Sequence, residues 1–366
     1  MKRIVVMIVL MGAIPFMSSG QVVNTATMDT TSFNAIGKIS VGGYIDAYYA
    51  YNFNDPQGKD QPYFVSMARD KEVNINLAYI DLKYSSSRLR ARFVPGFGTY
   101  INANYAAENG TLKNIVEASA GIKVAKNKDI WIDAGVFGSP YTNESAISKD
   151  HLAYTRSFAP EYVPYYLSGV KLTTPLGKKV NLYLYLLNGW QQIIDQNSKL
   201  SLGTQLEIRP TDNLLINWDT YIGDERSAMD TTVGPRYFTD LYFIYNKGRF
   251  SATSCFYVGM QRQSESKDGV WWTANFIARY NLTDKLSATG RIEHFNDDRS
   301  VQIVPITGIN GFSSNSSSLG LNYKLADNVL LRLEGRTFFS DKEVYIRDGK
   351  PVKNSNTLTS NVTIWF

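Results

Sequence analysis

The chain has 366 residues and a formal net charge of +5, and its composition differs from that of an ordinary soluble protein. Aromatic residues reach 13 %, while charged residues make up only 19 %, below the roughly 25 % of typical globular chains. Two His and one Cys leave little for a metal centre or a Ser-His triad, and Cys255 alone cannot form an internal disulfide. The small net charge implies no polybasic face, so we expect no nucleic-acid partner and no cofactor or metal.

The N-terminus has the pattern of an export signal. Lys2 and Arg3 form a positive start, an apolar stretch runs to Phe16, and small residues precede Gln21. This order is typical of a cleaved signal peptide, and the apolar stretch is shorter than the roughly 17–25 residues that span a bilayer. We therefore predict a signal peptide at 1–20 and a periplasmic segment at 21–37. We expect no transmembrane helix in the mature chain.

From Ile39 onward the chain reads as β-strands, with alternating apolar and polar residues between clusters of Gly, Asn, Asp and Ser. The pattern predicts sixteen strands, at 38–52, 72–84, 88–105, 113–125, 129–137, 166–176, 179–189, 199–209, 213–224, 233–245, 249–261, 270–282, 285–295, 313–325, 329–340 and 356–366. Extra strand-like runs, at Val301–Pro305 and Val344–Ile346, leave 14 to 18 strands open.

The connections between these strands alternate in length. Short breaks with hairpin-turn residues, such as Gly177-Lys178 and Thr283-Asp284, are followed each time by a longer polar break. The longer breaks are 53–71, 106–112, 138–165, 190–198, 225–232, 262–269, 296–312 and 341–355. Outer-membrane barrels have short periplasmic turns and longer outer loops, whereas a soluble sandwich has no reason to sort its connections this way.

The two faces of each strand differ in polarity. In 329–339, Leu331 and Leu333 share a face with Val329, while Arg332 and Glu334 lie on the opposite one. A charge facing lipid near the bilayer midplane costs about 2–4 kcal/mol, so the charged faces should point into a lumen. We therefore predict an all-β protein, a closed antiparallel transmembrane β-barrel over 38–366.

Aromatic residues near strand ends indicate a girdle at the membrane interface. Tyr is abundant, and we expect the same girdle to account for most of it. The tryptophans assigned to the girdle are Trp131, Trp190, Trp271, Trp272 and Trp365.

Several stretches carry a resemblance to a known family. They are Gly43 to Asn52, Val116 to Ala118, Asp133 to Phe137 with Asn143 to Ser145, and Asn188 to Trp190 with Asp195 to Asn197. As an ordered set they resemble the OmpL-like β-barrel porin-2 family of Bacteroidetes and related bacteria. The resemblance implies an outer-membrane porin of a Gram-negative bacterium. The chain ends in Ile364-Trp365-Phe366, which separately resembles the signal by which Gram-negative outer-membrane proteins are recognised by the assembly machinery for insertion, with Phe366 as its aromatic end.

Enzymatic readings have little support. An outer-membrane hydrolase would need a His with a nucleophile and an orienting group. His151 lies in the long 138–165 connection, and His294 falls on the apolar face near the outer end of its strand. Neither belongs to a recognisable nucleophile motif, so we predict that the protein is not an enzyme.

A barrel of about sixteen strands encloses more space than its side chains fill, which predicts a water-filled channel for passive diffusion of small hydrophilic solutes. The longest connection, 138–165, is the candidate constriction loop, with Glu144, Asp150 and Arg156 as its charged residues. The candidate pore-lining residues are Arg90, Arg92, Glu207, Arg209, Arg291, Glu293, Arg332, Glu334 and Arg336.

Three questions stay open at this stage. The wall arginines oppose an acidic loop across the channel, pair with Glu207, Glu293 and Glu334 to brace the wall, or do both. A non-conducting structural or adhesive barrel and a carbohydrate-selective channel are the alternative functions. Outer-membrane lipid and diffusing solutes are the expected partners, and a homo-oligomer is an additional expectation.

Overall fold

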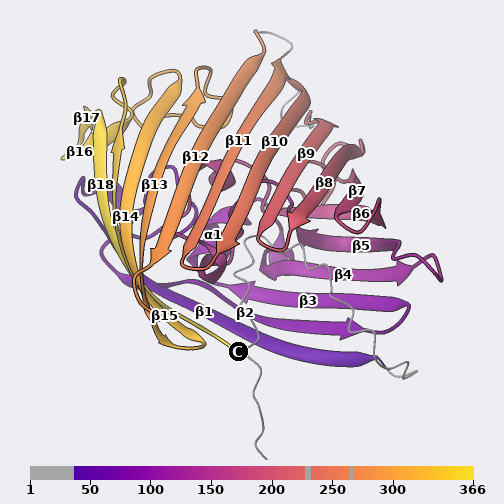
Figure 1. Cartoon of the computed structure of the whole chain (residues 1–366). Helices are drawn as coiled ribbons and strands as arrows, with labels where there is room; N and C mark the ends of the chain where they lie inside the picture. The colour runs from indigo at the N-terminus through magenta and orange to yellow at the C-terminus, as the bar shows by residue number, and fades with distance from the viewer. Residues whose placement is uncertain (1–36, 227–231, 264–266) are drawn as a thin grey trace, which may run out of the picture.

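The protein is a single closed β-barrel in the computed structural model, which describes residues 37–226, 232–263 and 267–366 (Figure 1). The predicted signal peptide and nearly all of the predicted periplasmic segment lie outside the described residues. Among the described residues, no helix is long and apolar enough to span a bilayer.

Sixteen strands of the described chain close the barrel, as predicted. Each strand pairs antiparallel with its neighbours in sequence, and the last strand of the barrel pairs with both β15 and β1. The wall strands are β1 Lys38–Asn52, β2 Val73–Ser85, β3 Leu89–Phe97, β4 Ile115–Lys123, β5 Trp131–Gly138, β6 Tyr166–Pro175, β7 Val180–Leu187, β8 Ser201–Thr211, β9 Leu214–Asp224, β10 Val233–Lys247, β11 Phe250–Gln263, β12 Gly269–Asn281, β13 Leu286–Asp297, β14 Phe312–Ala326, β15 Val329–Phe339 and β18 Asn354–Trp365.

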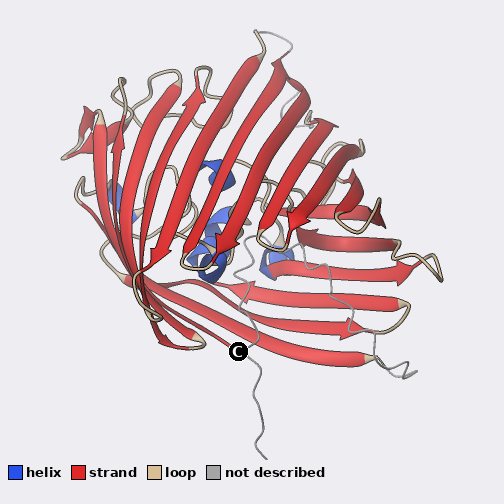
Figure 2. Cartoon of the chain, in the orientation of Figure 1, coloured by secondary structure: helices blue, strands red, loops and turns tan. Residues whose placement is uncertain are grey.

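The other elements belong to the connections. The run at Val344–Ile346 that left the strand count open forms a separate hairpin of β16 (Tyr345–Arg347) and β17 (Lys350–Val352) between β15 and β18. The helices are α1 (Thr99–Asn104) and α2 (Phe158–Glu161), with short 3-10 turns at Gln57–Lys59, Gly110–Asn114 and Ser148–Asp150. Figure 2 shows the helices within the ring of strands.

The alternation of short and long connections is confirmed, with one correction. The strand predicted at 88–105 ends at Phe97, and α1 follows at once. Gly98 has a φ of 133°, a backbone conformation that side-chain-bearing residues rarely adopt, and it turns the chain inward. Tyr100 and Ile101 are buried as a result, so their apolar character comes from packing inside the barrel rather than from a lipid-facing strand.

The predicted inside–outside phase is confirmed by burial. Leu319 and Ile292 are 77 % and 64 % exposed on the outer face, whereas their inward neighbours Ser318 and Arg291 are 6 % and 2 % exposed. The charged residues of these strands therefore face inward and the large apolar residues face outward, as a lipid environment requires.

The predicted aromatic girdle is wrong for several tryptophans. Trp131 and Trp271 point into the barrel, where Arg90 lies over Trp131 and Arg236 over Trp271. Trp190 packs inside the barrel against the ring of Tyr141. Proximity to a strand end does not decide the face, because successive residues alternate sides: Trp272 has the opposite orientation and packs against outward-facing His294. Trp365 is also inward, opposite Tyr44.

Many of the tyrosines also serve the interior rather than a girdle. Fully buried inward or loop tyrosines pack around the connections that enter the barrel. They are Tyr44, Tyr48, Tyr100, Tyr105, Tyr141, Tyr154, Tyr166, Tyr183, Tyr242 and Tyr257.

Candidate functional site

The connection between β5 and β6, loop 139–165, lies inside the barrel. Gly138, predicted to begin this loop, is the last residue of β5. All residues from His151 to Glu161 are buried, and the short helix α2 contacts β11, β12 and β13. The loop therefore occupies interior space that a barrel of this size would otherwise leave to water.

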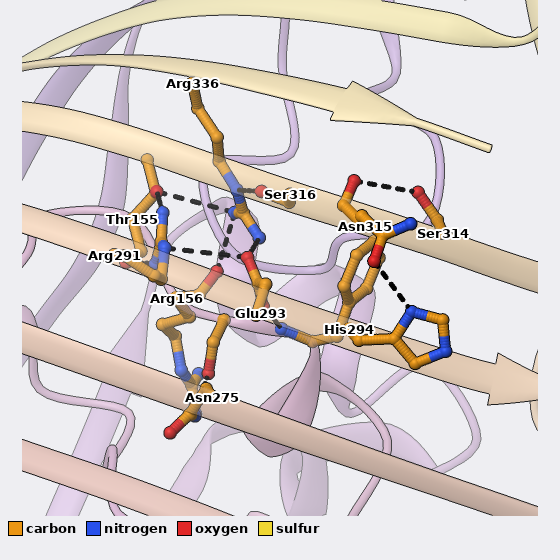
Figure 3. Close-up of polar contacts among 12 residues, drawn as sticks. Thr155, Arg156, Asn275, Arg291, Glu293, His294, Ser314, Asn315, Ser316 and Arg336 are labelled. Atoms are coloured by element: carbon orange, nitrogen blue, oxygen red, sulfur yellow. Dashed lines mark hydrogen bonds and ion pairs between the residues drawn. The ribbon is translucent and has the colours of Figure 1, made fainter.

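Four charged wall residues hold the middle of this loop, and we call them the anchor cluster: Arg291, Glu293, Glu334 and Arg336. Figure 3 shows Arg291, Glu293 and Arg336 of this cluster beside Thr155 and Arg156 of the loop. They come from neighbouring parts of β13 and β15. Arg291 pairs with Glu334 at 2.5 Å and with Glu293 at 3.5 Å, and Arg336 also pairs with Glu293. The alternative in which wall arginines pair with Glu293 and Glu334 is therefore what the structure contains.

The anchor cluster also binds the loop backbone directly. Arg291 donates to the Thr155 carbonyl and Arg336 to the Arg156 carbonyl, each at 2.7 Å. In return, the Thr155 amide donates to Glu334 at 2.7 Å, and the Phe158 amide donates to Glu293 at 2.6 Å. Each charge is balanced and hydrogen-bonded, which is the condition under which buried ions are tolerated.

A second contact fixes the turn at Ser148 to the seam where β1 and β18 meet. Arg332 donates to the Ser148 carbonyl at 2.6 Å and to its hydroxyl at 2.7 Å, and that hydroxyl donates to Asp46 at 2.9 Å. The Arg332 guanidinium also lies 4.6 Å from the centre of the Tyr154 ring. The loop thus contacts both the first strand of the barrel, β1, and the late strand β15.

A third contact holds the start of the loop against β10 to β12. The Thr142 amide donates to Asp240 at 2.7 Å. The Asn143 side chain donates to Thr253 at 3.0 Å and to Asn275 at 2.9 Å.

The charged residues of the loop itself have different surroundings. Glu144 is buried and accepts a hydrogen bond from the Ser157 amide at 3.1 Å, and its burial raises its pKa. Arg156 is also buried, with its guanidinium 3.8 Å from the centre of the Tyr165 ring. Asp150 keeps 18 % of its side chain exposed beside Lys149, at an ion-pair distance of 3.0 Å. Only Asp150 of these three faces accessible space.

The two histidines have structural surroundings. His151 is buried and bonds the Ser145 carbonyl through Nε2 at 2.7 Å, and its burial holds the pKa of the imidazole well below its usual range. His294 contacts Asn315 through Nδ1 at 2.9 Å on the outer face (Figure 3).

A different set of inward charges remains partly accessible on β2 to β6, and we call it the partly exposed strip. Its side chains are 12–25 % exposed: Asp81, Arg90, Arg92, Glu117 and Lys171. They are also paired, for instance Arg92 with Glu117 at 2.7 Å and with Asp81 at 2.9 Å. Arg209 extends this basic character to β8, where its exposed side chain pairs with buried Glu207 at 3.1 Å.

The nine predicted pore-lining residues all point toward the interior, but they separate into two groups. Arg291, Glu293, Arg332, Glu334 and Arg336 are buried against the loop, while Arg90, Arg92 and Arg209 stay accessible. Glu207, the ninth, is buried beneath its partner Arg209. Sequence reasoning missed other inward charges, among them Asp46, Asp81, Glu117, Asp133, Lys171, Asp219 and Asp240. The two-residue period contained the signal for most of them, since each lies on the polar face of its strand.

A second outer connection, 53–72, covers the loop from above. The Phe64 ring packs against Phe158 and Phe338, and the Tyr162 hydroxyl donates to the Tyr63 carbonyl at 2.7 Å. A cavity of about 40 Å³ remains between this connection, Arg156 and Arg336. That volume has room for a few water molecules, since one needs roughly 10–15 Å³ by this measure.

Comparison with protein families identifies the chain. Residues 38–366 match the family described as "Putative beta-barrel porin-2, OmpL-like". The chain belongs to this family. It is thus an outer-membrane β-barrel porin, and the predicted family and class are confirmed. A comparison with curated proteins finds no match.

Solved porin structures share the fold at low sequence identity. The anion-selective porin from Comamonas acidovorans aligns with a TM-score of 0.60 at 9 % identity, covering 90 % of this porin and 100 % of that chain. The trimer form of OmpT from Vibrio cholerae aligns with a TM-score of 0.59 at 11 % sequence identity, covering 90 % of this porin and 100 % of that chain. OmpF from Salmonella typhi, in complex with daunomycin, aligns with a TM-score of 0.58 at 11 % sequence identity, covering 90 % of this porin and 98 % of that chain.

Proposed function

We propose that this porin lets small hydrophilic solutes diffuse across the outer membrane through a narrow passage between loop 139–165 and the partly exposed strip. The observation that carries the proposal is the unequal exposure of the interior charges. Side chains of the anchor cluster are at most 3 % exposed, whereas Arg90, Arg92 and Glu117 are 25 %, 20 % and 18 % exposed. Water therefore reaches the interior along β3 and β4.

The charges along this passage determine which solutes suit it. Arg92 and Lys171 stand on the wall, and Asp150 of the loop faces the same accessible space. Opposite charges across a narrow aqueous passage create a field that favours polar solutes over apolar ones. The buried tyrosines support packing around the loop rather than a line of aromatic rings for sugars. The proposal involves no catalytic role.

Shortening the loop tests this function. Removing residues between Tyr141 and Tyr162 should raise single-channel conductance in planar bilayers, because it takes away the material that fills the interior. A matched control removes Asp348 and Gly349, at the tip of the β16–β17 hairpin, and should leave conductance unchanged. Equal conductance of the shortened and original proteins would place the loop outside the solute path. If neither conducts, the protein is a structural or adhesive barrel.

Export and topology complete the proposal. The leader at 1–20 is cleaved before Gln21, residues 21–37 are periplasmic, and the short turns face the periplasm. Outer-membrane lipid surrounds the apolar outer face. The porin forms a homo-oligomer, as the trimer form of the Vibrio cholerae protein does. N-terminal sequencing of the mature protein tests the cleavage site, and analytical ultracentrifugation in detergent tests the oligomeric state.

Phe366 is proposed as the assembly signal. Its backbone exchanges two hydrogen bonds of 3.1 Å with Gly43, and a Cβ at Gly43 would lie 2.3 Å from the Phe366 ring. Glycine at this position therefore makes room for the terminal ring. Deleting Phe366 should lower the folded fraction in the outer membrane, measured by heat-dependent migration in gels. Normal assembly of this variant would argue against the role.

A further inference from the structure

Two acidic side chains meet inside the barrel where the start of the loop is held. Asp219 of β9 and Asp240 of β10 are directly paired in the strand register, and both point inward. They are 0 % and 2 % exposed, and directly opposed residues of an antiparallel pair have Cβ atoms about 4.5–5.5 Å apart, so the two carboxyls are close neighbours. The Thr142 amide donates to Asp240, so the pair is part of the third loop contact.

This contact differs from the other two in its charge balance. The anchor cluster has two arginines for two glutamates, and Arg332 lies close to Asp46 through Ser148. No ion pair of the described residues includes Asp219 or Asp240. The titratable groups that face the pair are acidic or neutral: Glu207 of β8, Tyr183 and Tyr185 of β7, Tyr141 of the loop, Tyr242 of β10, and Cys255 and Tyr257 of β11.

The hydrogen bonds around the pair are also incomplete. Neither carboxylate oxygen of Asp219 has a hydrogen-bond donor among the described residues, and Oδ1 of Asp240 has none either. Two carboxylates that share a dry site cannot both be ionised, because their repulsion is hardly screened there. One proton between them would remove a charge and supply the missing donor.

We propose that Asp219 and Asp240 share one proton, and that this proton fastens the start of loop 139–165 to the wall so that pH sets the width of the passage. When rising pH removes the proton, two adjacent negative charges repel each other. Asp240 then moves and takes Thr142 with it, which loosens the loop. The passage is therefore narrow at low pH and wider at high pH. The effect on conductance rests on the proposed function, whereas the shared proton does not.

Infrared spectroscopy of the porin reconstituted in vesicles tests the shared proton directly. A protonated carboxyl has its own C=O stretch, and buried carboxyls are known to titrate as high as about pH 8–9. We expect a band that disappears as the pH rises from about 5 to about 9 and that is lost in both Asp219→Asn and Asp240→Asn, whereas any band of Glu144 or Asp150 remains in both variants. Asp81→Asn, in the partly exposed strip, is the matched control and should keep every band. Spectra in which neither Asp219→Asn nor Asp240→Asn loses a band overturn the proposal.

Conductance tests the coupling to the loop. The conductance of the original protein should increase as the pH rises over the same range. The midpoint of this increase should fall at the same pH as the midpoint of the infrared change. Asp219→Asn carries a permanent amide donor beside Asp240, so it should stay at the low-pH conductance throughout. If this variant keeps the pH step, the pair does not control the loop.

A cation in place of the proton is the other way to balance the pair. If the C=O band is absent at low pH and a chelator of divalent cations produces the change expected from high pH, the pair holds a metal ion and the proposal fails. If no variant conducts under any condition while the band behaves as expected, the proposed function fails and the shared proton stands.

Discussion

The anchor cluster and the partly exposed strip use the same kinds of side chain for different ends. Both contain arginines paired with carboxylates on inward faces, yet Arg291 and Glu334 are fully covered whereas Arg92 and Glu117 remain in contact with water. The difference comes from the loop, which lies against one wall and leaves the other uncovered. A charged residue on a barrel strand therefore indicates the face that points into the interior. The position of a loop then decides whether that residue holds the loop or lines the water-filled passage.

The largest expected effect on stability comes from a substitution that disrupts the anchor cluster. Glu334→Ala leaves Arg291 with a weaker partner and removes the acceptor for the Thr155 amide and hydroxyl. Removing one partner of a buried ion pair costs about 3–5 kcal/mol. We expect a loss of this size in the free energy of unfolding, measured by urea denaturation in vesicles. Glu117→Ala in the strip should cost less, because Arg92 keeps Asp81 as an ion-pair partner and its side chain stays partly exposed to water. Equal losses would mean that the two regions do not differ.

The second-largest effect comes from placing a large side chain on each of the two walls, the one that contacts the loop and the one that carries the partly exposed strip. Ser316 is 2 % exposed and accepts a hydrogen bond from Arg336, so Ser316→Trp has no space and should cost about 1–3 kcal/mol in unfolding free energy. Ser119, beside Arg92 on β4, is only half-buried. Ser119→Trp should keep the stability of the parent and reduce single-channel conductance instead. A stable Ser316→Trp with reduced conductance would place the passage on the opposite wall.

The smallest effect concerns ion selectivity. Asp150→Asn should shift the reversal potential in a KCl gradient toward anions, because Asp150 is the partly exposed carboxylate of the loop. Buried Glu144 serves as the control, and Glu144→Gln should shift it little. The shift should shrink in strong salt, as the Debye length falls from about 10 Å at 0.1 M to about 3 Å at 1 M.

The same carboxylate gives a pH dependence. Burial raises the pKa of Asp150, so on acidification it loses its charge at a higher pH than an ordinary Asp. The original protein should therefore become more anion-selective as the pH falls, and Asp150→Asn should not change. A variant as pH-dependent as the parent would assign the titration to another group.

The wall was predictable from sequence because lipid and water impose a two-residue period on every strand. The end of β3 was not, since Tyr100 and Ile101 are apolar for the sake of packing inside the barrel. Adjacent Trp271 and Trp272 show the same limit, because only the strand phase separates an interior ring from an outward one.

For the candidate functional site, the sequence predicted which wall residues point inward but not which of them bind loop 139–165. That Arg332 binds Ser148 depends on how a loop folds through space, which no local pattern encodes. The meeting of Asp219 and Asp240 did leave a signal. Strands predicted on both sides of the 225–232 connection form a hairpin, and its register places the two residues opposite each other.

The loop contacts have a consequence for the order of folding. Ser148 is 184 residues from Arg332 and 102 from Asp46, and Thr155 is 179 residues from Glu334. Contacts between such distant residues form late, because the chain between them must first be ordered. β18 must therefore pair with both β15 and β1 before the loop has its full binding surface. The closure of the wall and the placing of the loop that fills its interior are thus coupled, because the same seam completes both.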